Sequence, residues 1–155
     1  MIETPTSVLT VCLGNICRSP MAEGLLRHHI QINGLRIKVD SAGTNGYHNG
    51  ESPDYRAQAE MRRNGIEIAA QESRQIKKRD FDKFDAILVM DSSNYSDVMA
   101  LAGEREKWRS KVHKFLKHGD VPDPYFGGES GFTQVYHLIN DAAEAWVEQW
   151  KARET

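Results

Sequence analysis

The residues best suited to chemistry lie in one run near the amino terminus, Cys12-Leu13-Gly14-Asn15-Ile16-Cys17-Arg18-Ser19. A loop of this length between a strand and a helix can wrap its backbone N–H groups around one tetrahedral anion, and the helix start adds partial positive charge. The planar guanidinium group of Arg18 can bind two phosphate oxygens at once. The run therefore predicts a phosphate-binding loop made by Leu13, Gly14, Asn15, Ile16, Cys17 and Arg18.

Cys12 is the candidate nucleophile of this loop. The donors and the helix dipole that bind phosphate also stabilise a thiolate, so we expect Cys12 to lose its proton easily. Gly14 and Asn15 tolerate left-handed backbone conformations, which suits a tight loop whose N–H groups converge. Ser19 can donate a hydrogen bond to the sulfur when Cys12 leaves as a thiolate.

Turnover of a phosphate monoester also needs a proton for the departing alcohol or phenol, and Asp123 is the candidate acid. It lies in the segment VPDPYFGG, where Pro122 and Pro124 restrict the backbone and can hold a carboxyl group over the loop. We expect activity to peak on the acid side of neutrality, because Cys12 must be ionised while Asp123 keeps its proton.

The elements that must position these groups alternate along the chain. Strands are expected at 7–13, 36–39, 85–90 and 111–116, with a turn of small residues directly after the second. Helices are expected from Pro20 to Gly34, from Ser52-Pro53 to Asn64, over 94–101, and along a last apolar stripe that includes Trp146 and Trp150. This alternation predicts a three-layer α/β sandwich with a four-stranded parallel sheet. Cys12 then lies at the carboxyl end of a strand, where such sheets bind ligands.

Composition restricts the class of protein. A chain of 155 residues with 39% hydrophobic and 27% charged residues is expected to fold as one domain, residues 1–155. A net charge of -2 argues against nucleic acid as a partner, and no apolar segment approaches the length needed to span a membrane. Two cysteines are too few for a secreted disulfide framework, so we expect a cytoplasmic protein. The six histidines show no ligand spacing, so neither a metal nor another cofactor is expected.

The two motifs together resemble the low-molecular-weight protein tyrosine phosphatases. The similarity covers essentially the whole chain and includes the run at 12–20 and Asp-Pro-Tyr at 123–125. The resemblance implies a flavodoxin-like or Rossmann-like fold and hydrolysis of phosphotyrosine through a phosphocysteine on Cys12. Arg18 and the loop amides would bind the phosphate, and Asp123 would first protonate the leaving group and then activate water. It also implies that Asn15, Ser19 and Ser41 support the loop.

The chain departs from the family pattern at two positions. Gln71 stands where many members have a histidine in the supporting network, so that network is expected to be rearranged. Phe126 replaces the second of two adjacent tyrosines in the acid segment. The residues that match the apolar or aromatic walls of the family's pocket are Leu13, Tyr47 and Tyr125. These walls favour aryl phosphates.

Alternatives stay open at several points. Cys17 can pack as a small apolar residue, or it can form a disulfide with an oxidised Cys12 and protect it. The rival functions are a thiol-dependent arsenate reductase, which would use cysteines beyond Cys17, and a phospho-ligand binding module without turnover. The expected partners are tyrosine-phosphorylated proteins, with inorganic phosphate or other oxyanions as ligands or inhibitors, and we expect a monomer or a weak dimer.

Overall fold

The computed structural model describes residues 4–154; residues 1–3 and 155, which the expected domain includes, lie outside this range. In the described chain, one all-parallel sheet has the strand order β2-β1-β3-β4. Its strands are β1 (Ser7–Cys12), β2 (Lys38–Gly43), β3 (Ala86–Val89) and β4 (Val112–Lys114). The predicted four-stranded parallel sheet is therefore confirmed.

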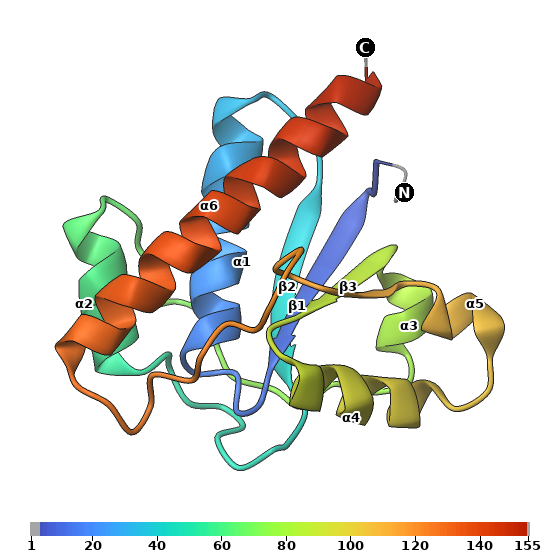
Figure 1. Cartoon of the computed structure of the whole chain (residues 1–155), viewed down its shortest axis with the longest axis horizontal. Helices are drawn as coiled ribbons and strands as arrows, with labels where there is room; N and C mark the ends of the chain where they lie inside the picture. Colours follow the sequence, from blue (N-terminus) through green and yellow to red (C-terminus); the bar gives the residue numbers. More distant parts are fainter. Residues whose placement is uncertain (1–3, 155) are drawn as a thin grey trace.

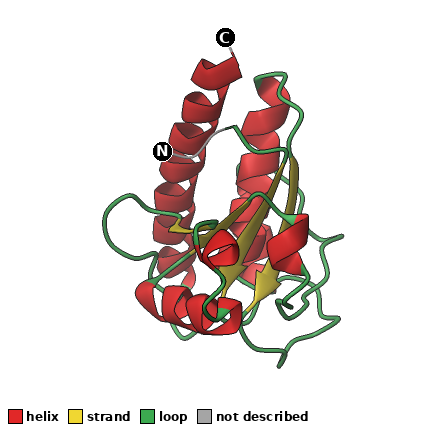
Figure 2. Ribbon diagram, turned by 90° about the vertical axis from the view of Figure 1, so that its right-hand side faces the viewer, coloured by secondary structure: helices red, strands yellow, loops and turns green. Residues whose placement is uncertain are grey.

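Helices lie on both sides of the sheet (Figure 1). One side carries α1 (Arg18–Ile32), α2 (Tyr55–Arg63) and α6 (Glu129–Glu154), and the other carries α3 (Asp80–Lys83), α4 (Ser92–Ala102) and α5 (Glu106–Arg109). The two long helices α1 and α6 run alongside each other, as the side view shows (Figure 2). The molecule is thus the three-layer α/β sandwich that the sequence predicts.

Alternation along β1 divides the core into two clusters. Val8 and Cys12 pack toward α1 and α6, whereas Leu9 and Val11 pack toward α3, α4 and α5. All four side chains are at most 2% exposed. A central parallel strand that is covered on both faces is expected to be apolar on both, which explains why β1 is almost entirely apolar, with Thr10 as its buried polar residue.

The expected bounds of the second strand were wrong. We placed the strand at 36–39 with a turn after it, but β2 runs from Lys38 to Gly43. Ser41 and Ala42 continue the strand because they pair with Thr10 and Val11 of β1. Small polar residues favour turns locally, and here the pairing with a buried strand prevails over that preference. The extension brings Ser41 beside the loop that follows β1.

The other predicted strands and helices begin or end within a few residues of the bounds that the sequence indicates. The helix α2 begins after Asp54, whose carboxylate caps it by accepting a hydrogen bond from the N–H of Arg56 (2.8 Å). The last helix begins at Glu129, and its Trp150 is fully buried, which confirms the packing role expected for that residue. Neither α3 nor α5 was predicted, since a four-residue helix is too short to show a periodic pattern.

Candidate active site

The candidate site lies where the strand order of the sheet reverses. From the central strand β1 the connection leads to β2 on one side, while β3 lies on the other, so a crevice opens at the carboxyl ends of β1 and β3. Cys12 ends β1 and α1 begins at Arg18. The hydroxyl of Thr10 donates to the carbonyl oxygen of Ser19 (2.9 Å) and ties the strand to the first turn of the helix. Residues 12–19, the anion loop, are thereby fixed at both ends.

The backbone of the anion loop is hydrogen-bonded to neighbouring segments of the protein through its carbonyl groups. The oxygens of Cys12, Leu13 and Ile16 accept from the N–H groups of Thr44, Asn45 and Asp54 at 2.8–3.0 Å, and the oxygen of Gly14 accepts from the hydroxyl of Ser73 (3.0 Å). By contrast, the N–H groups of residues 13–17 donate to no other group in residues 4–154. With the carbonyls turned to the protein, these N–H groups are left to bind an anion.

Asn15 is the left-handed residue of the loop, with φ 58°, as expected. Its side-chain N–H group donates to the hydroxyls of Ser19 (2.8 Å) and Ser41 (3.0 Å), and its carbonyl oxygen accepts from the N–H of Arg74 (3.0 Å). The structure therefore brings the three predicted support residues together. Gly14 does not adopt the left-handed conformation that it tolerates, since its φ is not positive; a Cβ there would lie 3.0 Å from the ring of His48.

The thiol of Cys12 lies at the bottom of the loop and is 2% exposed. Its Sγ is 3.0 Å from the Oγ of Ser19. The Ser19 oxygen accepts from Asn15, and the Ser19 hydroxyl can donate either to the sulfur or, over a longer distance of 3.4 Å, to the carbonyl oxygen of Ala42. This geometry suits the stabilisation of a thiolate at Cys12.

Glu23 joins the supporting network, although no motif in the sequence marked this residue. Its Oε1 accepts from the Ser41 hydroxyl (2.7 Å), and its Oε2 pairs with Arg27 (2.8 Å). Burial raises the pKa of Glu23, although the Ser41 hydrogen bond and Arg27 oppose this effect. Gln71 is placed differently: its amide N–H donates to the carbonyl oxygen of Pro20 (3.1 Å), and its Oε1 is buried without a partner.

Arg18 is only 2% exposed, and its guanidinium group is held by hydrogen bonds to neighbouring groups. Its Nη1 donates to the Asp91 carboxylate (2.6 Å) and to the carbonyl oxygen of Val121 (3.0 Å). Burial alone would lower the pKa of Arg18, but the negative charges of Cys12, Asp91 and Asp123 raise it. Asp91 follows β3 and caps α4, so it reaches the site from the other side of the crevice. A carboxylate directly after a buried strand is the signal that could have revealed it.

Asp123 lies across the mouth of the anion loop, in the acid loop (residues 121–128). Its Oδ2 is 3.5 Å from Nη2 of Arg18, and its Oδ1 accepts from the N–H of Tyr125 (3.1 Å). Its side chain is 37% exposed. The structure thus brings the three expected catalytic residues, Cys12, Arg18 and Asp123, to one place.

The expected wall residues are all exposed. Tyr47 is 85% exposed, Leu13 is 44% exposed and Tyr125 is 36% exposed. The segment with Tyr47 is joined to the anion loop by the hydrogen bond from Asn45 to Leu13. His48, which we had not singled out, lies with its ring centroid 6.2 Å from that of Tyr125. These aromatic side chains are available to contact a substrate.

Cys17 is a free thiol, 3% exposed, in the same loop as the free thiol of Cys12. Burial raises the pKa of Cys17, and the charges of Asp54 and Cys12 raise it further. Cys17 is therefore protonated at neutral pH, as a packed apolar residue would be.

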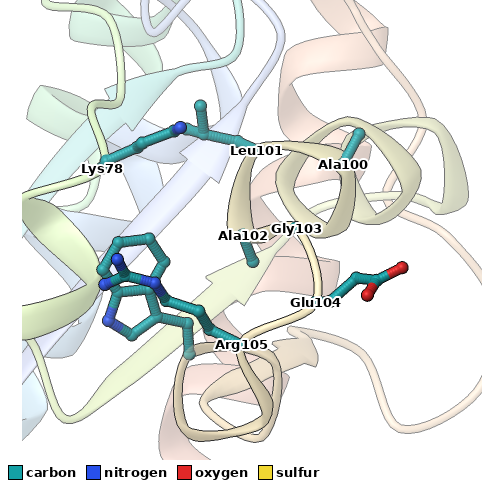
Figure 3. A pocket seen from close by; sticks show the side chains of 8 residues that line it. Lys78, Ala100, Leu101, Ala102, Gly103, Glu104 and Arg105 are labelled. Atoms are coloured by element: carbon teal, nitrogen blue, oxygen red, sulfur yellow. The ribbon is translucent and has the colours of Figure 1, made fainter.

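Features outside this crevice do not join the site. A pocket of about 320 Å³ lies at the end of α4, where the guanidinium group of Arg105 stacks 4.2 Å from the ring centroid of Trp108 (Figure 3). The pocket shares no residue with the anion loop or the acid loop. Within residues 4–154, no group of three or more His, Cys, Asp or Glu side chains is placed to hold a metal ion. No helix of the described chain is both long and apolar enough to cross a membrane.

The fold and the loop define an α/β protein that presents a thiol at the centre of an anion-binding loop. Residues 7–155 match the family model described as low molecular weight phosphotyrosine protein phosphatase. A human low molecular weight phosphotyrosine protein phosphatase is 40% identical, with 96% of this chain and 99% of that protein covered. The YfkJ phosphatase of Bacillus subtilis is 41% identical, with 89% and 91% covered.

Solved structures agree with this result. A protein tyrosine phosphatase from Entamoeba histolytica with Hepes in its active site superposes with a TM-score of 0.89 and 35% identity, covering 97% of this chain and 99% of that one. Wzb of Vibrio vulnificus in complex with benzylphosphonate gives a TM-score of 0.85 at 29% identity, covering 93% and 98%. The chain belongs to the low molecular weight phosphotyrosine protein phosphatase family and is a hydrolase of phosphoric monoesters.

Proposed function

We propose that this chain hydrolyses aryl phosphate monoesters, phosphotyrosine in proteins above all, through a phosphocysteine at Cys12. The observation that carries the proposal is the position of the Cys12 thiol, 3.0 Å from the Ser19 hydroxyl, among loop N–H groups that have no partner within residues 4–154. Such groups stabilise both the thiolate and the charge on a transferred phosphoryl group.

In the first step, the thiolate of Cys12 attacks phosphorus and the bond from phosphorus to the leaving oxygen breaks. Asp123 gives its proton to that oxygen, so the product leaves as an alcohol or phenol. Arg18 and the loop N–H groups bind the three equatorial oxygens. Water then attacks phosphorus, Asp123 takes the proton, and Cys12 leaves as a thiolate that accepts a hydrogen bond from Ser19.

The proposed substrates are tyrosine-phosphorylated proteins. The exposed aromatic rings of Tyr47 and Tyr125, with the side chain of Leu13, offer apolar contacts to a phenyl ring that a short alkyl phosphate would not use. Inorganic phosphate and other oxyanions should compete for the anion loop. We further propose a cytoplasmic protein, monomeric or weakly dimeric, that needs no metal or other cofactor.

The test is hydrolysis of para-nitrophenyl phosphate in excess chelator by the native chain and by Cys12→Ser. We expect chelator-resistant turnover that the substitution abolishes, because a serine hydroxyl does not ionise at neutral pH as a thiol can. Phosphate binding without turnover in the native chain would favour the binding module instead. Arsenate reduction with thioredoxin would favour the arsenate reductase, although no cysteine other than Cys17 exists to pass on the oxidation.

The redox role of Cys17 is a separate proposal. After peroxide oxidises Cys12, attack by Cys17 would form an intramolecular disulfide, with water as the leaving product, and a thiol reductant would restore the enzyme. The two cysteines share one loop. We expect Cys17→Ser to lose recoverable activity after peroxide treatment, whereas a variant that recovers as well as the native chain would leave Cys17 a packing residue.

A further inference from the structure

Arg56, in the first turn of α2, contacts the acid loop with its whole guanidinium group. Its Nη1 donates to the carbonyl oxygen of Gly127 (3.0 Å), and its Nη2 donates to that of Tyr125 (2.8 Å). Its Cζ lies 4.7 Å from the ring centroid of Phe132, which is buried in the first turns of α6. The guanidinium group therefore holds the acid loop just after Asp123, where the chain enters α6.

Asp54 fixes Arg56 from the opposite side. The carboxylate accepts from Nε (3.1 Å) and from Nη2 (3.1 Å) of Arg56, so it binds the guanidinium edge with both oxygens. Burial alone would raise the pKa of Asp54, but the hydrogen bonds from Arg56 lower it. The carboxylate is thus ionised at neutral pH, and the pair, here called the Asp54–Arg56 bridge, is charged on both sides.

The bridge also reaches the anion loop. The N–H of Asp54 donates to the carbonyl oxygen of Ile16 (2.8 Å). One residue thus contacts the backbone beside Cys17 and also orients the side chain that binds the acid loop. Figure 1 shows why this is possible: α2 lies beside the first turns of α6, and the two helices are in contact.

The acid loop has few other constraints. At the start of the loop, Val121 donates to the carbonyl oxygen of Met90 (2.9 Å) and accepts from Arg18 (3.0 Å). Beyond it, within the described chain, the polar contacts of residues 122–127 with the rest of the protein are those to Arg56 and the 3.5 Å ion pair of Asp123 with Arg18. When a substrate binds, the guanidinium group of Arg18 has to point toward the phosphate. The bridge is then the polar contact on the carboxyl-terminal side of Asp123 that keeps its carboxyl group at a fixed distance from the anion loop.

We propose that Arg56 is a positioning residue, which sets the distance between the Asp123 carboxyl group and the leaving oxygen of the substrate. The inference rests on the proposed role of Asp123 as general acid. A displaced acid slows only the steps that need its proton. Loss of the bridge should therefore matter most for substrates whose leaving group is a weakly acidic phenol, since an acidic phenol departs readily without protonation.

The experiment measures kcat/KM for a series of substituted phenyl phosphates with Arg56→Lys and Arg56→Ala. Lysine keeps the charge but cannot donate to Asp54, Tyr125 and Gly127 in one plane. For phenyl phosphate we expect a loss of roughly tenfold to a hundredfold, because small displacements of a catalytic group cost this much. For para-nitrophenyl phosphate the loss should be smaller by about tenfold.

Two controls make the result specific. Arg62→Ala removes a guanidinium group from the same helix, where it pairs with Glu67 at the surface (2.7 Å), and should leave the series unchanged. The inhibition constant of inorganic phosphate should also be unchanged in Arg56→Lys, since the anion loop keeps its own hydrogen bonds. If Arg56→Ala does not fold, Arg56→Lys alone decides the question.

Asp123→Asn separates the inference from the function on which it rests. If that variant shows the steep dependence on the leaving group and both Arg56 variants do not, the positioning role is overturned while Asp123 remains the acid. Equal losses on all substrates in the Arg56 variants would also overturn it. If Asp123→Asn shows no dependence on the leaving group, the assignment of Asp123 fails, and the inference fails with it.

Discussion

The anion loop and the acid loop meet at one site, but they are held in different ways. In the anion loop, Cys12, Asn15 and Ser19 are each at most 2% exposed, and the hydrogen bonds that join the side chains of Cys12, Asn15, Ser19 and Ser41 are buried. In the acid loop, Asp123 is 37% exposed and Phe126 is 92% exposed. The first loop is built into the junction of β1 and α1, whereas the second crosses the surface between β4 and α6.

The difference matches what each loop has to do. A thiolate and the charge of a phosphoryl group need donors that are already in place, since reorganising them during the reaction would cost free energy. A proton donor must admit the substrate and release the product, which an exposed loop allows. We therefore expect substitutions in the acid loop to lower activity while leaving the free energy of unfolding unchanged. Substitutions in the anion loop should lower both.

The largest expected effect separates activity from stability in the acid loop. Asp123→Asn should lower kcat/KM for phenyl phosphate by roughly 10²–10⁴-fold, because an amide cannot donate the proton. Its free energy of unfolding in urea should change by less than about 0.5 kcal/mol, since the side chain is exposed. Asp120→Asn is the matched control, because Asp120 is exposed nearby and its polar contacts within residues 4–154 are those with Ser92 and Lys114. Equal rates for the two variants would contradict the assignment.

A smaller effect on activity, joined to a loss of stability, is expected in the anion loop. Asn15→Ala leaves the hydroxyls of Ser19 and Ser41 without their donor, and a buried polar group left unpaired costs about 1–3 kcal/mol. Alanine also strains at φ 58°, by about 1 kcal/mol. Urea unfolding of Asn15→Gly, which lacks that strain, gives the part due to the amide. An unchanged unfolding midpoint in both variants would contradict the expectation that substitutions in the anion loop lower stability.

The smallest effect concerns pH and the buried Glu23. Its pKa is raised in the folded state above the ordinary value of 4.5, chiefly by burial. The contribution of Glu23 to stability is therefore fully present below about pH 4.5 and is lost as the pH rises through the folded-state pKa. The unfolding free energy of Glu23→Gln minus that of the native chain should become more positive between pH 5 and pH 8. A difference that stays flat over this range would show that Glu23 does not titrate in the support network.

Much of the site could be predicted because its main parts are local. A buried strand, a loop with Cys12 and Arg18, and a helix start are neighbours in the chain, so their spacing alone places them together. Asp123 was found through its own motif and then through family resemblance. Gln71 could be marked as a departure from the family, but its contact with Pro20 and the entry of Glu23 into the network could not be foreseen.

The remaining parts depend on the packing of distant segments. Asp91 reaches Arg18 because β3 lies next to β1, and Arg74 binds Asn15 because its segment crosses beside the end of β2. Asp54 and Arg56 look like an ordinary helix start in the sequence. The order of the four strands and of the helices α1, α2, α4 and α6, and the chemistry of residues 12–19, can be derived from the sequence alone, since hydrophobic periodicity and loop composition act locally. The side chains that support that chemistry are known from the folded chain, because strand order and helix packing, rather than spacing along the chain, bring these partners together.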